Sequence, residues 1–319
     1  MSMARKSSIM YLGIWGRLCR EKMMNGDQID KSHRGFTLIE MAMVLGVIAL
    51  VLTILMPVSV SMLDTQKRQD AKAKLAVIDS ALVNFVVLNR RLPCPADGTV
   101  ATGVANAGVE TLVVATGLCA PPTEISGVVP WVTLGISEDS ATDPWRGRIT
   151  YRVDTNLARA FPAVPNRLMD MSWCDPAGPA VAVGSACVAG CAGATCTSPQ
   201  NFLNGKGLPV SDGNGIGNWL NNPIVAPYTG AAYVLISHGP SGTGSYINSG
   251  NLSPGTIAAG TSEILNQNNR VLMTGGVLGA SYRDAALDDT TTALHFDDYL
   301  SHPTIMAVLQ NANLGPRAH

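Results

Sequence analysis

The sequence is poor in charged and in aromatic residues. Only 14% of its 319 residues are Asp, Glu, Lys or Arg and only 5% are Phe, Trp or Tyr, whereas it contains 32 Gly and 19 Pro. This composition disfavours a helical enzyme and is typical of a globular domain rich in loops and short strands. From residue 36 onward, acidic residues outnumber basic ones by 20 to 15. The sequence therefore lacks the basic excess expected of a nucleic-acid-binding protein.

The sequence also lacks the spacing of a hydrolase nucleophile. Ser241 lies in a Gly-Pro-Ser-Gly run, but Thr243 occupies the position where the nucleophile elbow Gly-x-Ser-x-Gly needs its second glycine. Ser237 and His238 are adjacent, and neighbouring side chains on a strand point to opposite faces. We assign no catalytic residue and predict that the protein is not an enzyme.

One segment is almost free of charge. The 23 residues that follow Glu40 contain no charged side chain. As a helix, residues 36–56 would be about 31 Å long, which matches a hydrocarbon core of about 30 Å. Glu40 at the start of this segment is costly, because an acidic side chain deep in a bilayer costs on the order of 3 kcal/mol, and less near the interface. The pattern predicts a transmembrane helix in which Glu40 has a functional role.

A seven-residue run joins this segment to a basic leader. Residues 34–40 read Arg-Gly-Phe-Thr-Leu-Ile-Glu. The run resembles the N-terminal signal of type IV prepilins and type II secretion pseudopilins, in which a basic leader ends in Gly, an apolar residue follows and Glu is fifth in the mature chain. The corresponding residues here are Gly35, Phe36 and Glu40. An ordinary signal anchor, in which Glu40 is incidental, is the alternative.

The resemblance implies a series of steps and a set of partners. A prepilin peptidase would cleave between Gly35 and Phe36, and the new amine of Phe36 would be methylated. The Glu40 carboxylate would pair with the Phe36 amine of a neighbouring pilin or pseudopilin subunit. An inner-membrane assembly platform with a cytoplasmic ATPase would extract the subunit from the membrane lipid.

The resemblance further implies a structural subunit of a type IV pilus or a type II secretion pseudopilus. Its globular part is large, which favours a minor subunit over the main building block. A membrane-tethered extracytoplasmic binding protein or adhesin that does not polymerise is the alternative function. Both functions place the protein in the bacterial inner membrane as a single-pass protein with a periplasmic C-terminal domain.

The implied fold is α+β and pilin-like, with one long N-terminal helix packed on a strand-rich, disulfide-pinned domain. The expected segments are a leader at 1–35, a transmembrane and polymerisation helix at 36–60, an amphipathic continuation at 61–92, and a globular domain at 93–319 with a Gly- and Cys-rich insertion near 175–222. The leader is long, and Met23 and Met24 are alternative starts to Met1.

The apolar pattern beyond the membrane segment is helical. Apolar residues recur at intervals of three and four from Leu75 to Phe85, which is typical of an amphipathic helix. One helix could therefore run from residue 36 to about residue 91, where Pro93 disfavours helical geometry in the preceding residue. Pro57 lies inside this helix and removes one backbone hydrogen bond. The resemblance identifies Pro57 as a flexible point.

Beyond Cys94 the sequence predicts turns and short strands. The candidate strands are Thr111–Ala115, Val128–Leu134, Arg148–Val153, Ala231–Ser237 and Val271–Thr274. Two stretches in this region are also similar to pseudopilins. One is the Asp-Pro-Trp turn at 143–145, in which we expect Trp145 to be a packing anchor. The other is the strand and glycine loop at 233–239.

Six of the seven cysteines follow the apolar segment: Cys94, Cys119, Cys174, Cys187, Cys191 and Cys196. An even set in an exported domain predicts up to three disulfides. We favour a bridge between Cys94 and Cys119 and two bridges within the cluster at 174–196. A zinc site in that cluster is the alternative, but its spacings of 13, 4 and 5 do not repeat a C-x-x-C knuckle.

Two acidic regions are weak candidates for calcium, the one ion that the sequence favours. The run 212–215 offers Asp212 and Asn214, and a later pair offers Asp288 and Asp289. Neither has the acidic residue that an EF-hand needs at its twelfth position. We predict no other cofactor and assign no metal site.

Two histidines near the end of the sequence flank acidic residues. His295 and His302 lie on either side of Asp297 and Asp298. The histidines are seven residues apart and lack the short spacing of a common zinc motif. We therefore expect a solvated loop here rather than a metal site.

Overall fold

The computed structural model describes the chain from Gly35 to His319 with gaps. The described residues are 35–113, 115–120, 127–160, 168–179, 186–187, 189–213, 217–255, 260–267, 281–288 and 294–319. For residues 54–60 and 194 the description covers the backbone alone. The leader before Gly35, the calcium candidates Asn214 and Asp289 and the predicted strand Val271–Thr274 lie outside the described residues. The chain divides into two compact units, residues 1–57 and 58–319.

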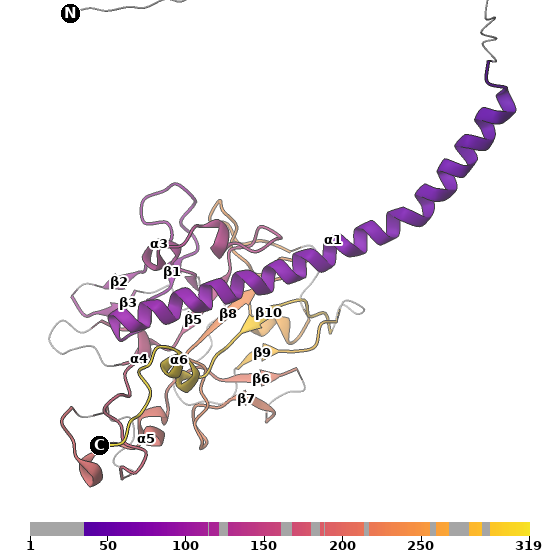
Figure 1. Ribbon diagram of the computed structural model, residues 1–319. Helices are drawn as coiled ribbons and strands as arrows, with labels where there is room; N and C mark the ends of the chain where they lie inside the picture. Colours follow the sequence, from indigo (N-terminus) through magenta and orange to yellow (C-terminus); the bar gives the residue numbers. More distant parts are fainter. Residues whose placement is uncertain are drawn as a thin grey trace, which may run out of the picture. The chain divides into compact units, whose positions relative to one another are not determined.

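Helix α1 spans Leu38–Asn89 and contains 52 residues (Figure 1). This confirms the single long helix expected between residues 36 and about 91. The helix begins after Thr37, whose Oγ1 accepts a hydrogen bond of 3.3 Å from the Glu40 amide, as an N-cap residue does. It ends before Arg90, which has a φ of 55°. Pro57 lies within the helix, but its side chain is outside the described residues, so its flexibility stays a prediction.

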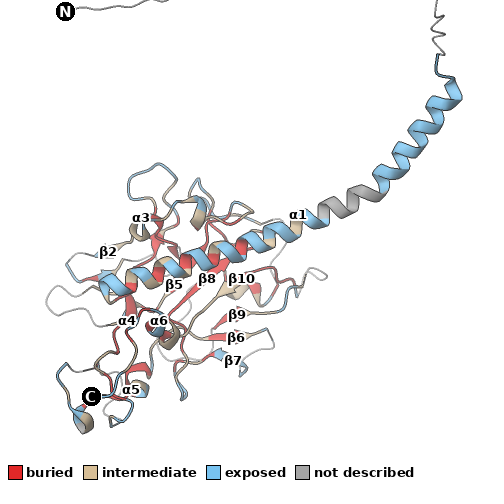
Figure 2. Cartoon of the chain, in the orientation of Figure 1, coloured by how far each residue is buried: buried red, intermediate tan, exposed pale blue. Residues whose placement is uncertain are grey.

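In the first unit, the described side chains of α1 from Leu38 to Thr53 are all exposed (Figure 2). They include large apolar groups, such as Leu38 at 90% and Leu45 at 61% exposure. A search of the described residues finds no helix with both the length and the apolar character of a membrane span.

The second unit is built on an antiparallel sheet of five short strands. The strands are β1 (Ala96–Asp97), β4 (Gly127–Val128), β5 (Thr150–Val153), β8 (Tyr233–Ser237) and β10 (Tyr299–Ser301). They lie in the order β1-β4-β5-β8-β10. The central pair is β5 with β8, in which Tyr151 is opposite Leu235. All five residues of β8 are buried, so this strand lies at the centre of the unit.

The second half of α1 packs across this sheet (Figure 1). Four apolar residues on one face of the helix are at most 4% exposed: Leu75, Ile78, Leu82 and Val86. They belong to the same hydrophobic core as Tyr151 of β5 and Leu235 of β8. Full burial of such a side chain contributes about 1.5–3 kcal/mol. The stripe that the sequence predicted on α1 is therefore the face that holds the helix on the sheet.

Smaller elements surround the main sheet. Strands β7 (Trp219–Asn221), β6 (Val210–Asp212) and β9 (Tyr282–Asp284) form a second sheet in which β6 and β9 are parallel. Strands β2 (Leu112–Val113) and β3 (Leu118–Cys119) form a hairpin. The short helices are α3 (Trp131–Leu134), α4 (Thr155–Ala158), α5 (Pro199–Leu203) and α6 (Ile305–Asn311), with 3-10 turns η1 (Asp139–Ala141), η2 (Gly193–Thr195) and η3 (Glu263–Leu265).

The strand predictions have mixed outcomes. Arg148–Val153 and Ala231–Ser237 are confirmed as β5 and β8, each two residues shorter at its start. Among the described residues of Thr111–Ala115, Leu112 and Val113 form strand β2. Trp145 contacts the hydrophobic core and stacks on the Tyr299 ring with centroids 6.0 Å apart, as a packing anchor does.

The prediction of a strand at Val128–Leu134 is wrong. Strand β4 ends at Val128, and Trp131–Leu134 form helix α3. Pro130 lies between them and has no amide hydrogen to continue a strand ladder. Gly135 then closes the helix with a φ of 69°, a conformation that glycine adopts without strain.

Three disulfides join the six cysteines of the second unit. Cys94 is bonded to Cys119, Cys174 to Cys187, and Cys191 to Cys196. The bridge between Cys94 and Cys119 is the one that the sequence favoured, and the other two lie within the 174–196 cluster as expected, where the sequence left the pairing open. The region 175–222, expected as an insertion, contains regular structure as well, because α5, β6 and β7 lie within it. The described fold is thus α+β, with a long N-terminal helix, short strands and three disulfides.

Candidate functional site

The N-terminal end of α1 is the first candidate site. Gly35, Phe36 and Thr37 precede the helix, and the first helical hydrogen bonds, from the amides of Glu40 and Met41, go to the Thr37 carbonyl at 3.0 and 3.2 Å. Phe36 is 76% exposed. A Cβ added at Gly35 would meet no atom within 4 Å. Packing in the described fold therefore does not require glycine at residue 35.

Glu40 lies in the first turn of α1 and is exposed. Among the described residues, its carboxylate takes part in no ion pair or hydrogen bond. Its neighbours Ile39 and Met43 are exposed apolar residues at 66% and 63%. A negative charge near a helix N-terminus gains about 0.3–1 kcal/mol from the helix dipole. The carboxylate is therefore placed favourably in the helix and is available to a partner outside it.

This geometry coincides with a known sequence motif. Residues 30–56 match the family model described as the prokaryotic N-terminal methylation motif. The chain carries a prepilin-type methylation signal. The motif includes Gly35, Phe36 and Glu40 and ends within the first part of α1, at Met56. It supports, at a coarse level, a precursor of the type IV pilin or pseudopilin kind.

The methylation motif implies processing by a prepilin peptidase and assembly with other pilin-type subunits. It also indicates a membrane-associated or surface location. The motif covers the N-terminal part of the chain and says nothing of residues 57–319. Comparisons with curated proteins and with solved structures give no match for the chain.

The structure describes one residue of each calcium candidate. Asp212 ends strand β6 and is in register with Asp284 of β9. Asp288 forms a β-bridge with Phe296. Their companions Asn214 and Asp289 lie outside the described residues, so calcium binding stays a prediction.

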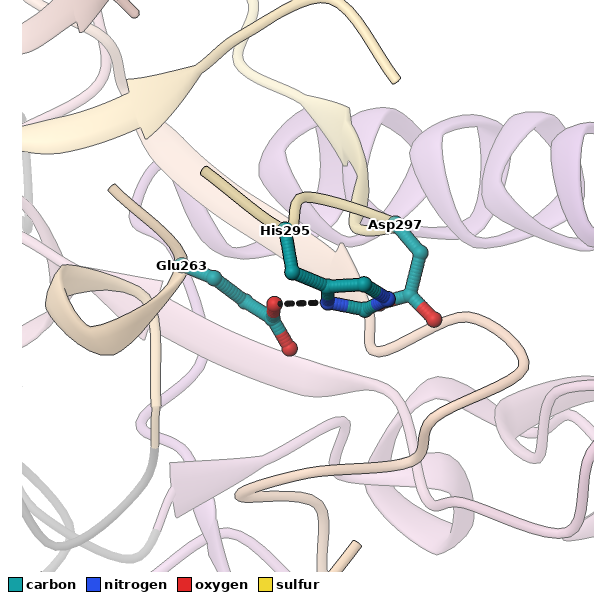
Figure 3. Close-up of side chains that lie close together, drawn as sticks. All are labelled: Glu263, His295 and Asp297. Atoms are coloured by element: carbon teal, nitrogen blue, oxygen red, sulfur yellow. Dashed lines mark hydrogen bonds and ion pairs between the residues drawn. The ribbon is translucent and has the colours of Figure 1, made fainter. Parts of the chain in front are cut away.

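A second candidate site is buried at the end of strand β8. Glu263 of η3, His295 and Asp297 offer three ligand atoms that lie within 4.8 Å of one another. Their exposures are 0%, 3% and 7%. Figure 3 shows the imidazole ring of His295 between the two carboxylates. We call these three residues the Glu-His-Asp cluster.

Hydrogen bonds hold the Glu-His-Asp cluster to a loop that follows β8. The Nδ1 of His295 lies 2.7 Å from the Oε2 of Glu263. The Ser241 hydroxyl contacts Oδ1 of Asp297 at 3.0 Å and Oε1 of Glu263 at 3.3 Å, and the Ser241 amide donates to Oδ2 of Asp297 at 2.6 Å. Both carboxylates are thereby fixed in orientation by one serine.

Burial changes the acidity of these groups. It raises the pKa of Glu263 to about 6, helped by the charge of Asp298. It also raises the pKa of Asp297 above its usual value. Burial acts to lower the pKa of His295, but the hydrogen bond to Glu263 and the nearby carboxylates outweigh it, so this pKa is raised. The cluster therefore favours a state in which a positive charge or a proton is shared between its members.

Asp298, the residue after Asp297, forms a buried pair with His238. The Nδ1 of His238 is 3.3 Å from the Oδ1 of Asp298, and both side chains are fully enclosed. The Nε2 of His238 lies 2.9 Å from the Thr150 hydroxyl. Asn266 donates to the other oxygen of Asp298 at 2.8 Å.

The expectation of a solvated loop around His295 and His302 is wrong. His295, Asp297 and Asp298 are at most 7% exposed, and His302 is half-buried between Asn221 and Asp284. Sequence reasoning missed Glu263, which is 32 residues before His295. Only the fold brings η3 beside the segment before β10. The single available signal was the unusual density of acidic residues and histidines between 295 and 302.

The serines near His238 contact carboxylates. The Ser237 hydroxyl donates to Oδ2 of Asp143 at 3.0 Å. His238, the next residue, contacts Thr150 and Asp298 instead. The two side chains thus diverge as neighbours on a strand do, and they do not form a nucleophile and base with each other.

Proposed function

We propose that the protein is a minor pilin or pseudopilin, processed between Gly35 and Phe36 and assembled into a filament through α1. The observation that carries this proposal is the methylation motif at residues 30–56, which includes the exposed and mostly apolar start of α1 from Leu38 to Thr53. We assign no enzymatic activity to the globular unit. The proposed pilin-like role of the protein is argued from helix α1 and from the disulfides.

Processing explains Gly35. A side chain at this residue would meet no atom within 4 Å, and its φ is not in the left-handed region. Neither packing nor backbone strain therefore accounts for glycine. Recognition by the active site of a prepilin peptidase accounts for it, because the residue before the scissile bond must fit that site.

Assembly explains Glu40. Cleavage leaves a positively charged amine at Phe36, one helical turn before Glu40. In a lipid environment an unpaired carboxylate is expensive, and the attraction between opposite charges is much stronger than in water. The amine of a neighbouring subunit's Phe36 would satisfy Glu40 and fix the axial register of the two helices. Among the described residues of its own chain, Glu40 has no competing partner.

The proposed location is the inner membrane before assembly, with a single span formed by residues 36–60, most of which belong to the charge-free run after Glu40. The three disulfides support an oxidising compartment for residues 94–196, because such bonds are rare in the cytosol. An assembly platform with a cytoplasmic ATPase would then move the subunit from lipid to filament. The large second unit, residues 58–319, favours a scarce or tip-located subunit.

The test of this proposal is the N-terminus of the mature protein. Intact-mass measurement of the protein from a host with a prepilin peptidase should give a chain that begins at Phe36 with one methyl group on its amine. Gly35→Leu should accumulate as the uncleaved precursor. Gly46→Leu is the matched control, because a Cβ at Gly46 also meets nothing within 4 Å; this variant should be cleaved normally. Normal cleavage of Gly35→Leu, or a mature chain with another first residue, contradicts the proposal.

A further inference from the structure

The Glu-His-Asp cluster has the composition of a metal site. Glu263, His295 and Asp297 bring two carboxylates and one imidazole within 4.8 Å of one another. Oxygen ligands alone suit Ca²⁺ and Mg²⁺, whereas an imidazole among the ligands suits Zn²⁺ and other first-row transition metals. The mixture of nitrogen and oxygen donors therefore points away from calcium and toward a zinc-like ion.

Three buried carboxylates lie in and beside the cluster, and they have few positively charged partners. Glu263, Asp297 and Asp298 are three carboxylates with exposures of 0%, 7% and 2%. Among the described residues, their ion pairs are with histidines alone: Glu263 with His295 and Asp298 with His238. A buried charge that is not compensated destabilises the folded state strongly. A divalent cation would supply the missing positive charge without a lysine or an arginine.

Asp298, the residue after Asp297, has partners of its own. Its Oδ1 lies 3.3 Å from the Nδ1 of His238, and its Oδ2 accepts a hydrogen bond from Asn266 at 2.8 Å. His238 is thereby engaged by Asp298. Among the described residues, His295 is the one ion-pair partner of the carboxylates of the Glu-His-Asp cluster.

The donor atoms are also held in place before any ion binds. Ser241 contacts both Glu263 and Asp297. Gly239 and Gly260 have no room for a Cβ, because the backbone of Asp297 and of His295 lies against them. Outer contacts of this kind orient the ligands of protein metal sites. The cluster is thus preorganised by the segments that surround it.

We propose that Glu263, His295 and Asp297 bind one first-row divalent transition-metal ion, with Zn²⁺ as the probe ion, as a structural site. The ion would bind the carboxylates and the neutral imidazole, since metal ligands act in their deprotonated forms. It would cross-link η3, the segment before β10 and, through Ser241, the loop after β8. The disulfides all lie between residues 94 and 196, so the metal would pin the part of the unit that they do not reach.

The experiment measures zinc in the purified full chain, produced without a polyhistidine tag. After dialysis against Zn²⁺ and then against metal-free buffer, elemental analysis should find one zinc ion per chain. His295→Gln and Glu263→Gln should each weaken zinc binding beyond the roughly 10- to 100-fold loss typical of outer-shell changes. His302→Gln is the matched control, because His302 also contacts a carboxylate, Asp284, at 3.0 Å but lies outside the cluster; it should keep its zinc.

A second measurement on the unchanged chain protects the test against misfolded variants. Zn²⁺ should raise the melting temperature of the metal-free chain, because a ligand that binds only the folded state stabilises it by mass action. Ca²⁺ at the same concentration should have no such effect. A chain that retains no more zinc than the buffer, stabilisation by Ca²⁺ alone, or equal zinc in His295→Gln would each overturn the proposal. None of these outcomes bears on processing at Gly35, so the two proposals stand or fall separately.

Discussion

Arg148 shows how a single residue organises several loops of the second unit. Its side chain is 1% exposed, and its guanidinium donates to the carbonyls of Gly98 and Val100 at 3.1 and 2.7 Å. It also forms an ion pair with Glu138 at 3.0 Å and lies over the Trp131 ring, 5.0 Å from its centroid. The charge is buried at a site where several fixed acceptors surround it.

We predict that Arg148→Lys destabilises the protein by about 3 kcal/mol, because breaking a buried, hydrogen-bonded charge network typically costs 3–5 kcal/mol. Lysine keeps the charge but lacks the planar fork that reaches several acceptors at once. Urea unfolding measures the change. Arg146→Lys is the control, since Arg146 is exposed, and it should change stability by less than about 0.5 kcal/mol. Equal effects of the two substitutions would contradict the role given to Arg148.

At the scale of elements, local sequence patterns predict helix α1 but do not predict the Glu-His-Asp cluster. The apolar run after Glu40 and the three-and-four spacing from Leu75 onward lie within one helix, so the sequence alone predicts them. Strand β8 is equally local, because a continuous apolar run precedes a glycine. The cluster depends on Glu263 meeting His295 across 32 residues, and no pattern within either segment encodes that contact. Polar residues near the end of the chain were therefore predicted to be solvated when they are buried.

The buried stripe of α1 gives the prediction at this scale. Leu82→Ala should destabilise the second unit by about 2–5 kcal/mol, because it leaves a cavity in the core. Leu82 is fully buried, whereas Leu88 on the same helix is 82% exposed. Leu88→Ala should therefore change stability by less than about 0.5 kcal/mol. Thermal unfolding of both variants measures the difference, with the loss of tertiary structure in the second unit monitored as the temperature rises. Similar melting temperatures for the two would mean that α1 is not anchored by this stripe.

At the scale of the whole molecule, the chain has two parts that differ in exposure and in cross-linking. The described side chains of α1 from Leu38 to Thr53 are exposed and mostly apolar, and these residues lie within the methylation motif. The second unit buries its own core and contains the disulfides. Its short strands and the parallel pairing of β6 with β9 depend on contacts between distant segments. The sequence therefore predicts the first part better than the second.

The molecular prediction concerns Glu40. Glu40→Gln should be cleaved at the same bond as the unchanged protein, because the residue lies five positions beyond Gly35. Its incorporation into filaments sheared from the cell surface should fall at least about tenfold, which corresponds to about 1.4 kcal/mol of lost docking energy. Immunoblots of sheared and cell-bound fractions measure the ratio. Unchanged incorporation would mean that the carboxylate does not pair with a neighbouring amine, and a subunit absent from every sheared fraction would favour a tethered binding protein.

The N-cap at Thr37 has one more consequence. Because the helical hydrogen bonds start at the Thr37 carbonyl, the peptide bond between Gly35 and Phe36 lies in non-helical backbone. Proteolytic enzymes generally bind the residues around the bond they hydrolyse in an extended form, so a bond inside a helix would first have to unwind. Here no turn of α1 has to open. A substitution that removed the cap and let the helix grow toward the leader would slow hydrolysis even though it left both residues at the bond intact.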